Sequence, residues 1–281
     1  MAILVHNLAT VRNCLKRMTW KNGKILGMEL DNDRLARLRA AYKVDLPGRM
    51  EIDTVSRILA AQGIETASCL DLGFHNPVAS MKLRELGGYW TSTVWTGSER
   101  RQFKEVLNED VLQVGIGDEL PFEDKQFDVV VLARGHLTGD PEKDMVLIRE
   151  CHRILKTPGY LIVGSEYRRR FSLMRLFGKG QAGGYNERQM FNLLESGFDV
   201  LGEKTYCRFW LQLMLRAFSG VDQNEGGFWR GVCFFVAYFL DFIFFFNKGY
   251  HLIAHGRRKT WREQHAADGH GRSLADSVLF S

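Results

Sequence analysis

Residues that could bind a nucleotide follow the first predicted strand. The segment LDLGFHNPVASMKLRELGG (70–88) begins as an apolar strand, turns at Gly73 and continues as a helix from residue 78. A glycine has no Cβ, so backbone amides at this turn can approach a ligand closely. The N-terminus of the following helix favours a carboxylate. His75 and Pro77 stand where a nucleotide-binding turn places further glycines. The turn is therefore a candidate cofactor site with an altered glycine pattern.

Three further predicted strands end in side chains that could contact a ligand. The second strand ends at Trp95, the third leads to Asp118 and Glu119, and the fourth leads to Ala133, Arg134 and His136. In an open α/β sheet, ligands bind beyond the carboxyl ends of the strands. His136 is either a proton-transfer group or a local hydrogen-bond donor. Arg134 either binds an anionic acceptor or pairs with Asp118 or Glu119. The segment GIGDEL (115–120) is not a dinucleotide motif, because it lacks a third glycine and Pro121 follows it.

Alternating strands and helices predict the elements that position these residues. Strands are expected at 67–72, 89–95, 111–115, 127–133, 159–165, 198–205 and 249–256. Helices are expected at 33–43, 49–62 and 78–87, and from Asp140 to Leu155. A capping box at Asn186 and Gln189 opens another helix, which stops at Gly197. This order predicts a doubly wound, Rossmann-like α/β fold with seven mostly parallel strands and helices on both faces.

Composition narrows the class of protein. The chain of 281 residues is 45% hydrophobic and 25% charged, which is typical of a globular protein and excludes disorder. Its five cysteines include no Cys-x-x-Cys pair, so neither a zinc site nor a disulfide framework is indicated. Cys69 and Cys151 are predicted to be buried thiols, which fits a reducing cytoplasm. The N-terminus does not read as a signal peptide, because His6 and Asn7 interrupt its apolar run.

Basic residues gather in two runs without acids. Residues 1–28 contain five lysines and arginines, alongside a helical apolar stripe at positions 4, 8, 11, 15 and 18. The second run contains Arg168, Arg169, Arg170, Arg175 and Lys179. Such runs suit an anionic surface or are simply solvated faces. A nucleic-acid partner is disfavoured, because the runs lack interleaved aromatic residues.

Residues 207–247 are expected to form a hydrophobic helical insertion before the last strand. The segment VCFFVAYFLDFIFFF (232–246) contains one charge, Asp241, and eight aromatic residues. A helix of this length measures about 22 Å, which is shorter than the ~30 Å hydrocarbon core of a bilayer. Cys233, Ala237 and Asp241 recur at helical spacing and form a narrow small or polar stripe. The apolar helices therefore pack on the sheet and on each other, form a homodimer interface, or face a membrane or lipid.

One long segment resembles a known family. The stretch GDELPFEDKQFDVVVLARGHLTGDPEKDMVLIRECHRILKTPGYLIV (117–163) is similar to the central part of class I S-adenosylmethionine-dependent methyltransferases, closest to those acting on small molecules and lipids. The shared features are Gly-Asp, Leu-Pro-Phe, an acidic turn, Phe-Asp, a histidine before Asp-Pro-Glu-Lys, and a Leu-Lys-Thr-Pro-Gly turn with one inserted residue, Thr157. YNERQMFNLLESGFDV (185–200) resembles the family's late helix and sixth strand. The resemblance implies S-adenosylmethionine as cofactor.

The resemblance assigns roles residue by residue. Its cofactor-binding positions are Asp71, Gly73, Phe74, His75, Trp95, Asp118, Glu119 and Ala133, its catalytic candidates are Arg134 and His136, and it implies no metal. Trp95 stands where the family has a carboxylate that binds the ribose hydroxyls. Losing that charge-assisted hydrogen bond costs about 1–3 kcal/mol. Glu99 could replace the carboxylate if its loop folds back.

Two functions follow from these observations. Residues 1–65 are expected to be an N-terminal helical extension, 66–258 the methyltransferase-like domain and 259–281 a flexible tail. The preferred interpretation is a methyltransferase that acts on a hydrophobic or lipid-like acceptor, in the cytoplasm or at the cytoplasmic face of a membrane. The alternative is a catalytically inactive relative that serves as a binding or assembly partner.

Overall fold

The computed structural model describes residues 32–115, 119–168, 183–218, 227–243 and 248–260. The chain divides into two compact units, Met1–Ala36 and Arg37–Ser281. Only residues 32–36 of the first unit are described, and they begin a helix. The predicted helix at 4–18, the basic residues at 12–24 and 169–179, Asp118 and residues 261–281 lie outside the described ranges.

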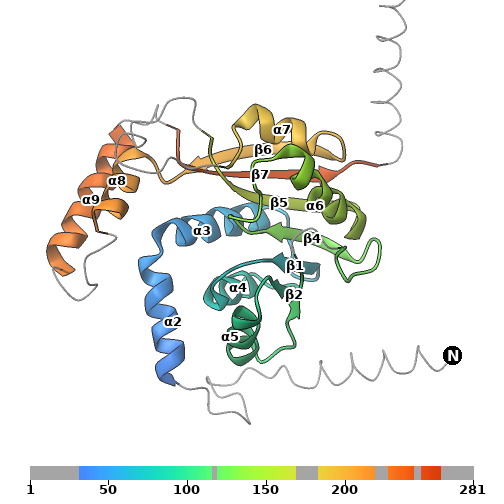
Figure 1. The fold of residues 1–281 in the computed structure, drawn as a ribbon, viewed down its shortest axis with the longest axis horizontal. Helices are drawn as coiled ribbons and strands as arrows, with labels where there is room; N and C mark the ends of the chain where they lie inside the picture. Colours follow the sequence, from blue (N-terminus) through green and yellow to red (C-terminus); the bar gives the residue numbers. More distant parts are fainter. Residues whose placement is uncertain (1–31, 116–118, 169–182, 219–226, 244–247, 261–281) are drawn as a thin grey trace, which may run out of the picture. The chain divides into compact units, whose positions relative to one another are not determined.

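The described residues form one sheet of seven strands (Figure 1). The strands are β1 (Ser68–Leu72), β2 (Tyr89–Val94), β3 (Leu112–Gln113), β4 (Phe127–Leu132), β5 (Leu155–Glu166), β6 (Phe198–Tyr206) and β7 (His251–Arg258). Their order across the sheet is β3-β2-β1-β4-β5-β7-β6. All neighbours are parallel except that β7 runs antiparallel to β5 and β6. The predicted Rossmann-like, mostly parallel sheet is confirmed.

Helices cover both faces of this sheet. The helices of the described residues are α2 (Asn32–Val44), α3 (Leu46–Ala60), α4 (Pro77–Arg84), α5 (Gly97–Leu107), α6 (Pro141–Ile154), α7 (Glu187–Leu194), α8 (Phe209–Ala217) and α9 (Gly227–Ile243). Helices α3, α4 and α5 share one hydrophobic core with the sheet, and α6 and α7 share the other. In β4, Val130 and Leu132 belong to the core with α6, whereas Val129 and Val131 belong to the core with α3. Because successive side chains of a strand alternate in direction, this apolar run needs cover on both sides.

Capping side chains set where the helices begin. The Asp140 carboxylate accepts a hydrogen bond from Glu142 N at 3.2 Å, so α6 begins at Pro141 as predicted. The predicted capping box of Asn186 and Gln189 opens α7. The sequence-based assignment missed α5, although a capping box at Thr96 and Glu99 opens it and the Thr-x-x-Glu pattern is visible in the sequence.

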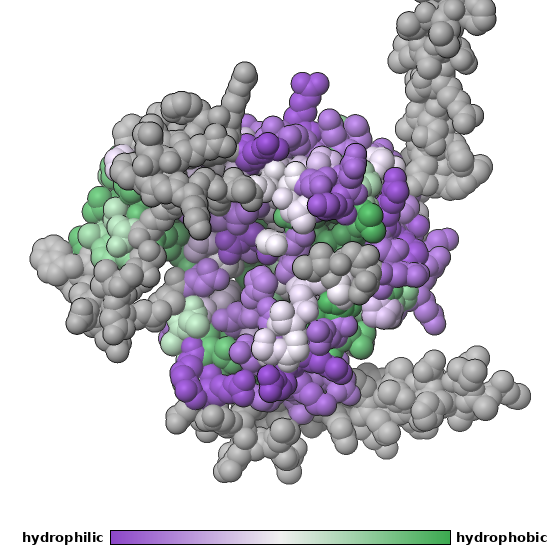
Figure 2. Space-filling model, in the orientation of Figure 1, coloured by the Kyte–Doolittle hydropathy of each residue, from purple (hydrophilic) through white to green (hydrophobic). Residues whose placement is uncertain are grey.

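Helices α8 and α9 form the predicted insertion and pack against each other. The Asp241 carboxylate of α9 accepts hydrogen bonds from the backbone amides of Trp210, at 2.9 Å, and Leu211, at 3.0 Å. It thereby satisfies amides at the start of α8 that have no partner within that helix. The opposite side of α9 exposes apolar side chains, and Figure 2 shows this hydrophobic surface over α8 and α9. Among the helices described, none combines the length and the apolar character needed to cross a bilayer.

Candidate active site

The tip of β1 carries the predicted cofactor turn. Gly73 has a φ of +83°, a left-handed conformation that favours glycine. A Cβ at this position would overlap the indole nitrogen of Trp95 and the imidazole of His136. Two independent constraints, the backbone conformation and the close approach of two rings, therefore require a glycine here.

Three rings lie beside this turn, and we refer to His75, Trp95 and His136 as the ring cluster. The centroid of the His136 ring lies 4.8 Å from that of Trp95 and 5.2 Å from that of His75. The three residues follow the ends of β1, β2 and β4, which are adjacent strands. The fold thus brings three predicted site residues together at Gly73.

One nitrogen of His136 has two competing partners. Its Nε2 atom lies 3.0 Å from Trp95 Nε1 and 2.5 Å from the carbonyl oxygen of Gly73. A neutral imidazole nitrogen can accept from the indole N–H or donate to the carbonyl, but it cannot do both. Burial lowers the pKa of His136 to about 4, so the neutral ring predominates near neutral pH. The hydrogen bond from Trp95 is therefore lost whenever His136 donates to Gly73.

Two carboxylates near the turn are occupied by protein partners. The fully buried Asp71 accepts hydrogen bonds at Oδ2 from Ser92 Oγ, at 2.8 Å, and Arg84 Nη1, at 3.2 Å. Glu99 lies 2.7 Å from His75 Nδ1 and accepts from the Thr96 amide at 3.1 Å. Burial acts to raise the pKa of Glu99, but the hydrogen bonds from His75 and Thr96 outweigh it and lower the pKa. Glu99 is thus held by the ring cluster and by the start of α5.

The remaining predicted cofactor residues lie in different surroundings. Phe74 is buried in the core that includes α3. The buried Ala133 continues the pairing of β1 and β4 through a hydrogen bond from its amide to the Leu72 carbonyl, at 3.0 Å. The side chain of Glu119 is 81% exposed and lies 4.0 Å from Arg153. Glu119 therefore faces solvent and Arg153 in this structure, and Asp118 lies outside the described residues.

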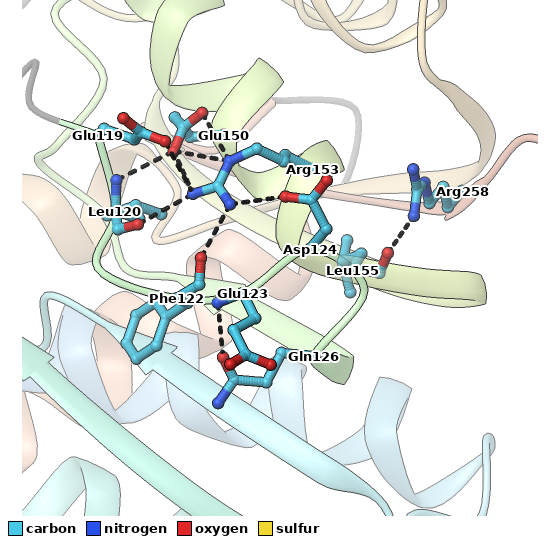
Figure 3. Close-up of polar contacts among 10 residues, drawn as sticks. All are labelled: Glu119, Leu120, Phe122, Glu123, Asp124, Gln126, Glu150, Arg153, Leu155 and Arg258. Carbon is cyan, nitrogen blue, oxygen red and sulfur yellow. Dashed lines mark hydrogen bonds and ion pairs between the residues drawn. The ribbon is translucent and has the colours of Figure 1, made fainter. Parts of the chain in front are cut away.

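Arg153 of α6 holds the loop that follows β3 (Figure 3). Its Nη1 donates to the Phe122 carbonyl at 2.8 Å and lies 2.9 Å from Asp124 Oδ1. Its Nη2 donates to the Leu120 carbonyl at 2.9 Å and to Glu150 Oε2 at 2.8 Å. A planar guanidinium offers donors in two directions, so a single side chain can fix both ends of the Leu-Pro-Phe segment.

A second group of polar side chains lies further along the same edge of the sheet. We call Glu51, Arg134, Glu166, Tyr206 and His251 the polar cluster. His251 is directly opposite Glu166 in β5 and Tyr206 in β6, so these three side chains emerge on one face of the sheet. Arg134 follows β4, and Glu51 comes from α3, which covers that face.

Arg134 is the centre of the polar cluster. Its backbone amide donates to Glu51 Oε1 at 2.8 Å, and its Nε donates to Glu51 Oε2 at 3.3 Å. Its Nη1 lies 3.4 Å from His251 Nε2 and 3.8 Å from Glu166 Oε1. His251 Nδ1 lies 2.9 Å from Glu166 Oε2, which is an ion-pair distance without hydrogen-bond alignment. Burial raises the pKa of Glu51, and Arg134 opposes that rise.

These contacts correct the sequence-based pairing of Arg134. It pairs with Glu51 and Glu166, whereas Glu119 pairs with Arg153. Gly164 makes the pairing possible, because a Cβ there would lie 2.6 Å from Glu51 Oε1.

Four members of the polar cluster were not predicted as site residues. Glu51, Glu166, Tyr206 and His251 come from four separate elements, and no local motif links them. His251 and His255 are four residues apart in β7, a spacing that does not bring both rings to one metal ion. The sequence signal that could have indicated this cluster is that Tyr206 and His251 stand on either side of the hydrophobic insertion, which brings the ends of β6 and β7 together.

Comparisons with known proteins agree on the fold. Residues 70–163 match the family model of a methyltransferase domain, which is about a third of the chain. A comparison with curated protein sequences gives no significant match.

Three solved structures illustrate the likeness. A Haloferax volcanii protein provisionally described as a methyltransferase, in complex with the Trm112 methyltransferase activator, has a TM-score of 0.52 and 16% identity over 83% of this chain and 96% of its own. A protein from Bacillus halodurans, also provisionally described as a methyltransferase, has a TM-score of 0.51 and 14% identity over 74% of this chain and 98% of its own. The cyclase SpnF has a TM-score of 0.50 and 19% identity over 74% of this chain and 82% of its own. At these identities the likeness shows the fold.

The sheet order and these matches define a class I methyltransferase fold. Residues 70–163 match a methyltransferase domain, and S-adenosylmethionine is the cofactor that this match indicates.

The ring cluster limits how that cofactor can fit. Trp95 and His136 occupy the space beside Gly73 into which a side chain, or a ligand, would extend. As placed, these residues do not fit a nucleoside at the tip of β1. Binding there requires the Trp95 side chain to turn away, and its shared hydrogen-bond partner makes it the less firmly held of the two rings.

Proposed function

We propose that the protein is an S-adenosylmethionine-dependent methyltransferase that acts on a hydrophobic or lipid-like acceptor at a membrane surface. The observation that carries the proposal is an exposed aromatic helix rooted at the carboxyl edge of the sheet. The amide of Tyr250 contacts the carbonyls of Tyr206, at 3.1 Å, and Cys207, at 2.9 Å. The chain therefore enters and leaves the insertion at one point, beside the polar cluster.

The exposed side of α9 is the surface proposed to meet lipid. We call it the aromatic face, and it consists of Val232, Phe235, Val236, Tyr238, Phe239, Phe242 and Ile243. Phe235 and Phe242 are each 71% exposed, and Phe239 is 54% exposed. Ala237 and Asp241, on the other side of the helix, are buried. A contiguous apolar surface of this kind is unusual on a monomeric globular protein and is typical of a docking site.

Charge favours a lipid surface over another protein as the partner of this face. The chain has a formal net charge of +5, and its two acid-free basic runs are at residues 1–28 and 167–186. Each lysine or arginine near an anionic membrane contributes about 1 kcal/mol to binding. An aromatic helix combined with basic segments is the pattern of a protein that lies on a bilayer.

Vesicle flotation tests the membrane part of the proposal. The parent protein is expected to float with vesicles that contain phosphatidylserine, and the triple variant Phe235→Gln, Phe239→Gln, Phe242→Gln is expected to remain in the dense fraction. The matched control is Val146→Gln, Phe191→Gln, Leu201→Gln, which changes three exposed apolar residues elsewhere. Unchanged flotation of the first variant refutes the proposal. A parent dimer that becomes monomeric in that variant, without flotation of either, assigns the face to a homodimer.

Calorimetric titration tests the cofactor part. The parent is expected to bind S-adenosylmethionine and its demethylated product saturably, and Gly73→Arg is expected to abolish binding. No heat and no thermal shift at millimolar ligand would favour a non-catalytic binding partner.

A further inference from the structure

An unpartnered hydroxyl lies at the base of the helical insertion. Tyr206 is the last residue of β6, and its side-chain oxygen is buried without a hydrogen bond to any of the described residues. Its ring lies 5.2 Å from that of His251. An unpaired buried hydroxyl costs about 1–3 kcal/mol. A ligand that accepts a hydrogen bond from this hydroxyl would therefore remove that cost.

The charges around Tyr206 determine whether a ligand group bound there is charged or neutral. Arg134 lies between the carboxylates of Glu51 and Glu166. An anionic head group would face both carboxylates, and an ammonium group would face the guanidinium. A neutral hydroxyl group can accept one hydrogen bond and donate another, so it suits both kinds of neighbour.

Tyr206 is suited to be the donor to such a group. Burial, assisted by Glu51, holds the pKa of Tyr206 well above its usual value, despite the opposing effect of Arg134. The hydroxyl therefore keeps its proton throughout the physiological range. It can donate to a ligand oxygen, while the Glu166 carboxylate can accept from the ligand's own hydroxyl.

The polar cluster is partly exposed to solvent and is linked to the cofactor turn through the backbone after β4. The side chains of Glu166 and Arg134 are 28% and 21% exposed, whereas those of Glu51 and His251 are almost closed. Arg134 directly follows Ala133, whose amide bonds to the Leu72 carbonyl at the end of β1. Helix α8 begins at Phe209, three residues after Tyr206, so apolar surface adjoins the polar cluster.

We infer that the polar cluster binds the hydroxyl group of the acceptor, an alcohol or phenol on an apolar skeleton. Tyr206 and Arg134 are its donors, and Glu166 is its acceptor. This inference rests on the proposed function, because it places the acceptor between the aromatic face and the cofactor turn. It makes Tyr206 a residue that determines specificity.

The test compares binding of para-octylphenol and octylbenzene to the full-length protein in the absence of cofactor. The parent is expected to bind the phenol roughly tenfold more tightly, which is the worth of one or two buried hydrogen bonds. Tyr206→Phe keeps the ring and removes the hydroxyl, so it is expected to lose most of that preference without changing the affinity for octylbenzene. Tyr89→Phe, at the exposed amino end of β2, is the matched control and is expected to behave as the parent.

Two results would overturn the inference. One is equal affinity of the parent for the two probes, or a full phenol preference in Tyr206→Phe. The other is a lower melting temperature of Tyr206→Phe, because removal of an unpaired buried hydroxyl should maintain or raise stability. Failure of flotation or of S-adenosylmethionine binding, with the phenol preference intact, refutes the proposed function and leaves the hydroxyl site standing.

Discussion

The ring cluster and the polar cluster lie on the same edge of the sheet, but they bury polar groups in different ways. In the ring cluster, a single nitrogen of His136 is shared by Trp95 and Gly73, so one hydrogen bond is always missing. In the polar cluster, Arg134 is bonded through its backbone and its guanidinium to Glu51 and lies close to Glu166. The first arrangement is held mainly by packing, and the second by charge.

This difference means that the Trp95 side chain can move at a lower cost than the Arg134 side chain. Rotating Trp95 away from Gly73 breaks one hydrogen bond that His136 can replace with its bond to the Gly73 carbonyl. Moving Arg134 leaves a buried carboxylate without its cation, which is far more costly. We therefore expect removal of a charge from the polar cluster to affect folding first, and removal of the Trp95 ring to affect ligand binding first.

The largest effect is expected from Glu51→Ala. The change leaves the Arg134 guanidinium partly buried with one carboxylate fewer, and it should lower the free energy of unfolding by about 3–5 kcal/mol. Urea denaturation measures this loss. Glu85→Ala removes an exposed partner of Lys82 and should change stability by less than about 0.5 kcal/mol. Similar losses of unfolding free energy in the two variants would mean that the pair of Glu51 and Arg134 contributes no more to stability than an exposed ion pair.

The next effect is a dependence of stability on pH. Burial lowers the pKa of His136 to about 4, below the ordinary value of 6.5. As the pH falls through this range, the unfolded chain takes up a proton first. The stabilisation is therefore present above pH 6.5 and is lost on the way to about 4. A shift of this size corresponds to an effect on the order of 3 kcal/mol.

Denaturation at both ends of that pH range checks the effect. His136→Asn should show a smaller loss of stability on acidification than the parent. His152, whose pKa burial also lowers to about 4, should account for part of the remaining loss. An unchanged pH dependence in His136→Asn would contradict the role of His136 in the loss of stability. An unchanged pH dependence in the His136→Asn, His152→Asn double variant would contradict the roles of both histidines.

Trp95→Asp tests whether a carboxylate in the ring cluster creates a site for a ribose. The change removes the ring beside Gly73 and introduces a carboxylate where the resemblance to S-adenosylmethionine-dependent methyltransferases places one. Affinity for S-adenosylmethionine should rise tenfold to hundredfold, or about 1–3 kcal/mol. Trp95→Asn removes the ring without adding charge. A gain in affinity that is also seen in Trp95→Asn comes from removing the ring, and a further gain in Trp95→Asp comes from a carboxylate that binds the ribose. Equal affinity in parent, Asn and Asp variants would show that Trp95 does not limit binding.

The smallest effect is expected from Arg153→Lys in α6, which alters the contacts that hold the loop after β3. A lysine cannot reproduce the forked contacts to Leu120 and Phe122, so stability should fall by about 1 kcal/mol. Backbone amides of residues 119–126 should exchange hydrogen faster. Arg149→Lys, an exposed arginine in the same helix, is the control. Equal rates of amide exchange in the two variants would show that contacts within the loop, and not Arg153, hold it in place.

Much of the fold could be predicted because its signals are local. The alternating apolar runs predicted β1, β2, β4 and β6 within about two residues of their observed bounds. Side-chain caps at Asp140 and Asn186 marked the starts of α6 and α7. The beginning of β5 was missed, because Leu155 joins the sheet through a pairing with Phe127 that no local pattern encodes.

The candidate site was predicted in part for the same reason. Gly73, Trp95 and His136 each follow a recognisable strand, and their meeting at one edge follows from a parallel sheet. Their contact as rings could not be predicted, because it depends on rotamers and on the space that Gly73 leaves. The cofactor-binding and catalytic roles assigned to these residues stay predictions.

The sequence by itself determined the class of fold, the family resemblance and the apolar character of the insertion, because periodicity and motif spacing are properties of neighbouring residues. Only the tertiary structure decided which charges meet. Glu51 and Arg134 are separated by 83 positions along the chain, and they pair because α3 places Glu51 against Gly164 of β5 and the residue that follows Ala133. Long-range pairing of this kind depends on how the layers pack, and no short stretch of sequence contains that information.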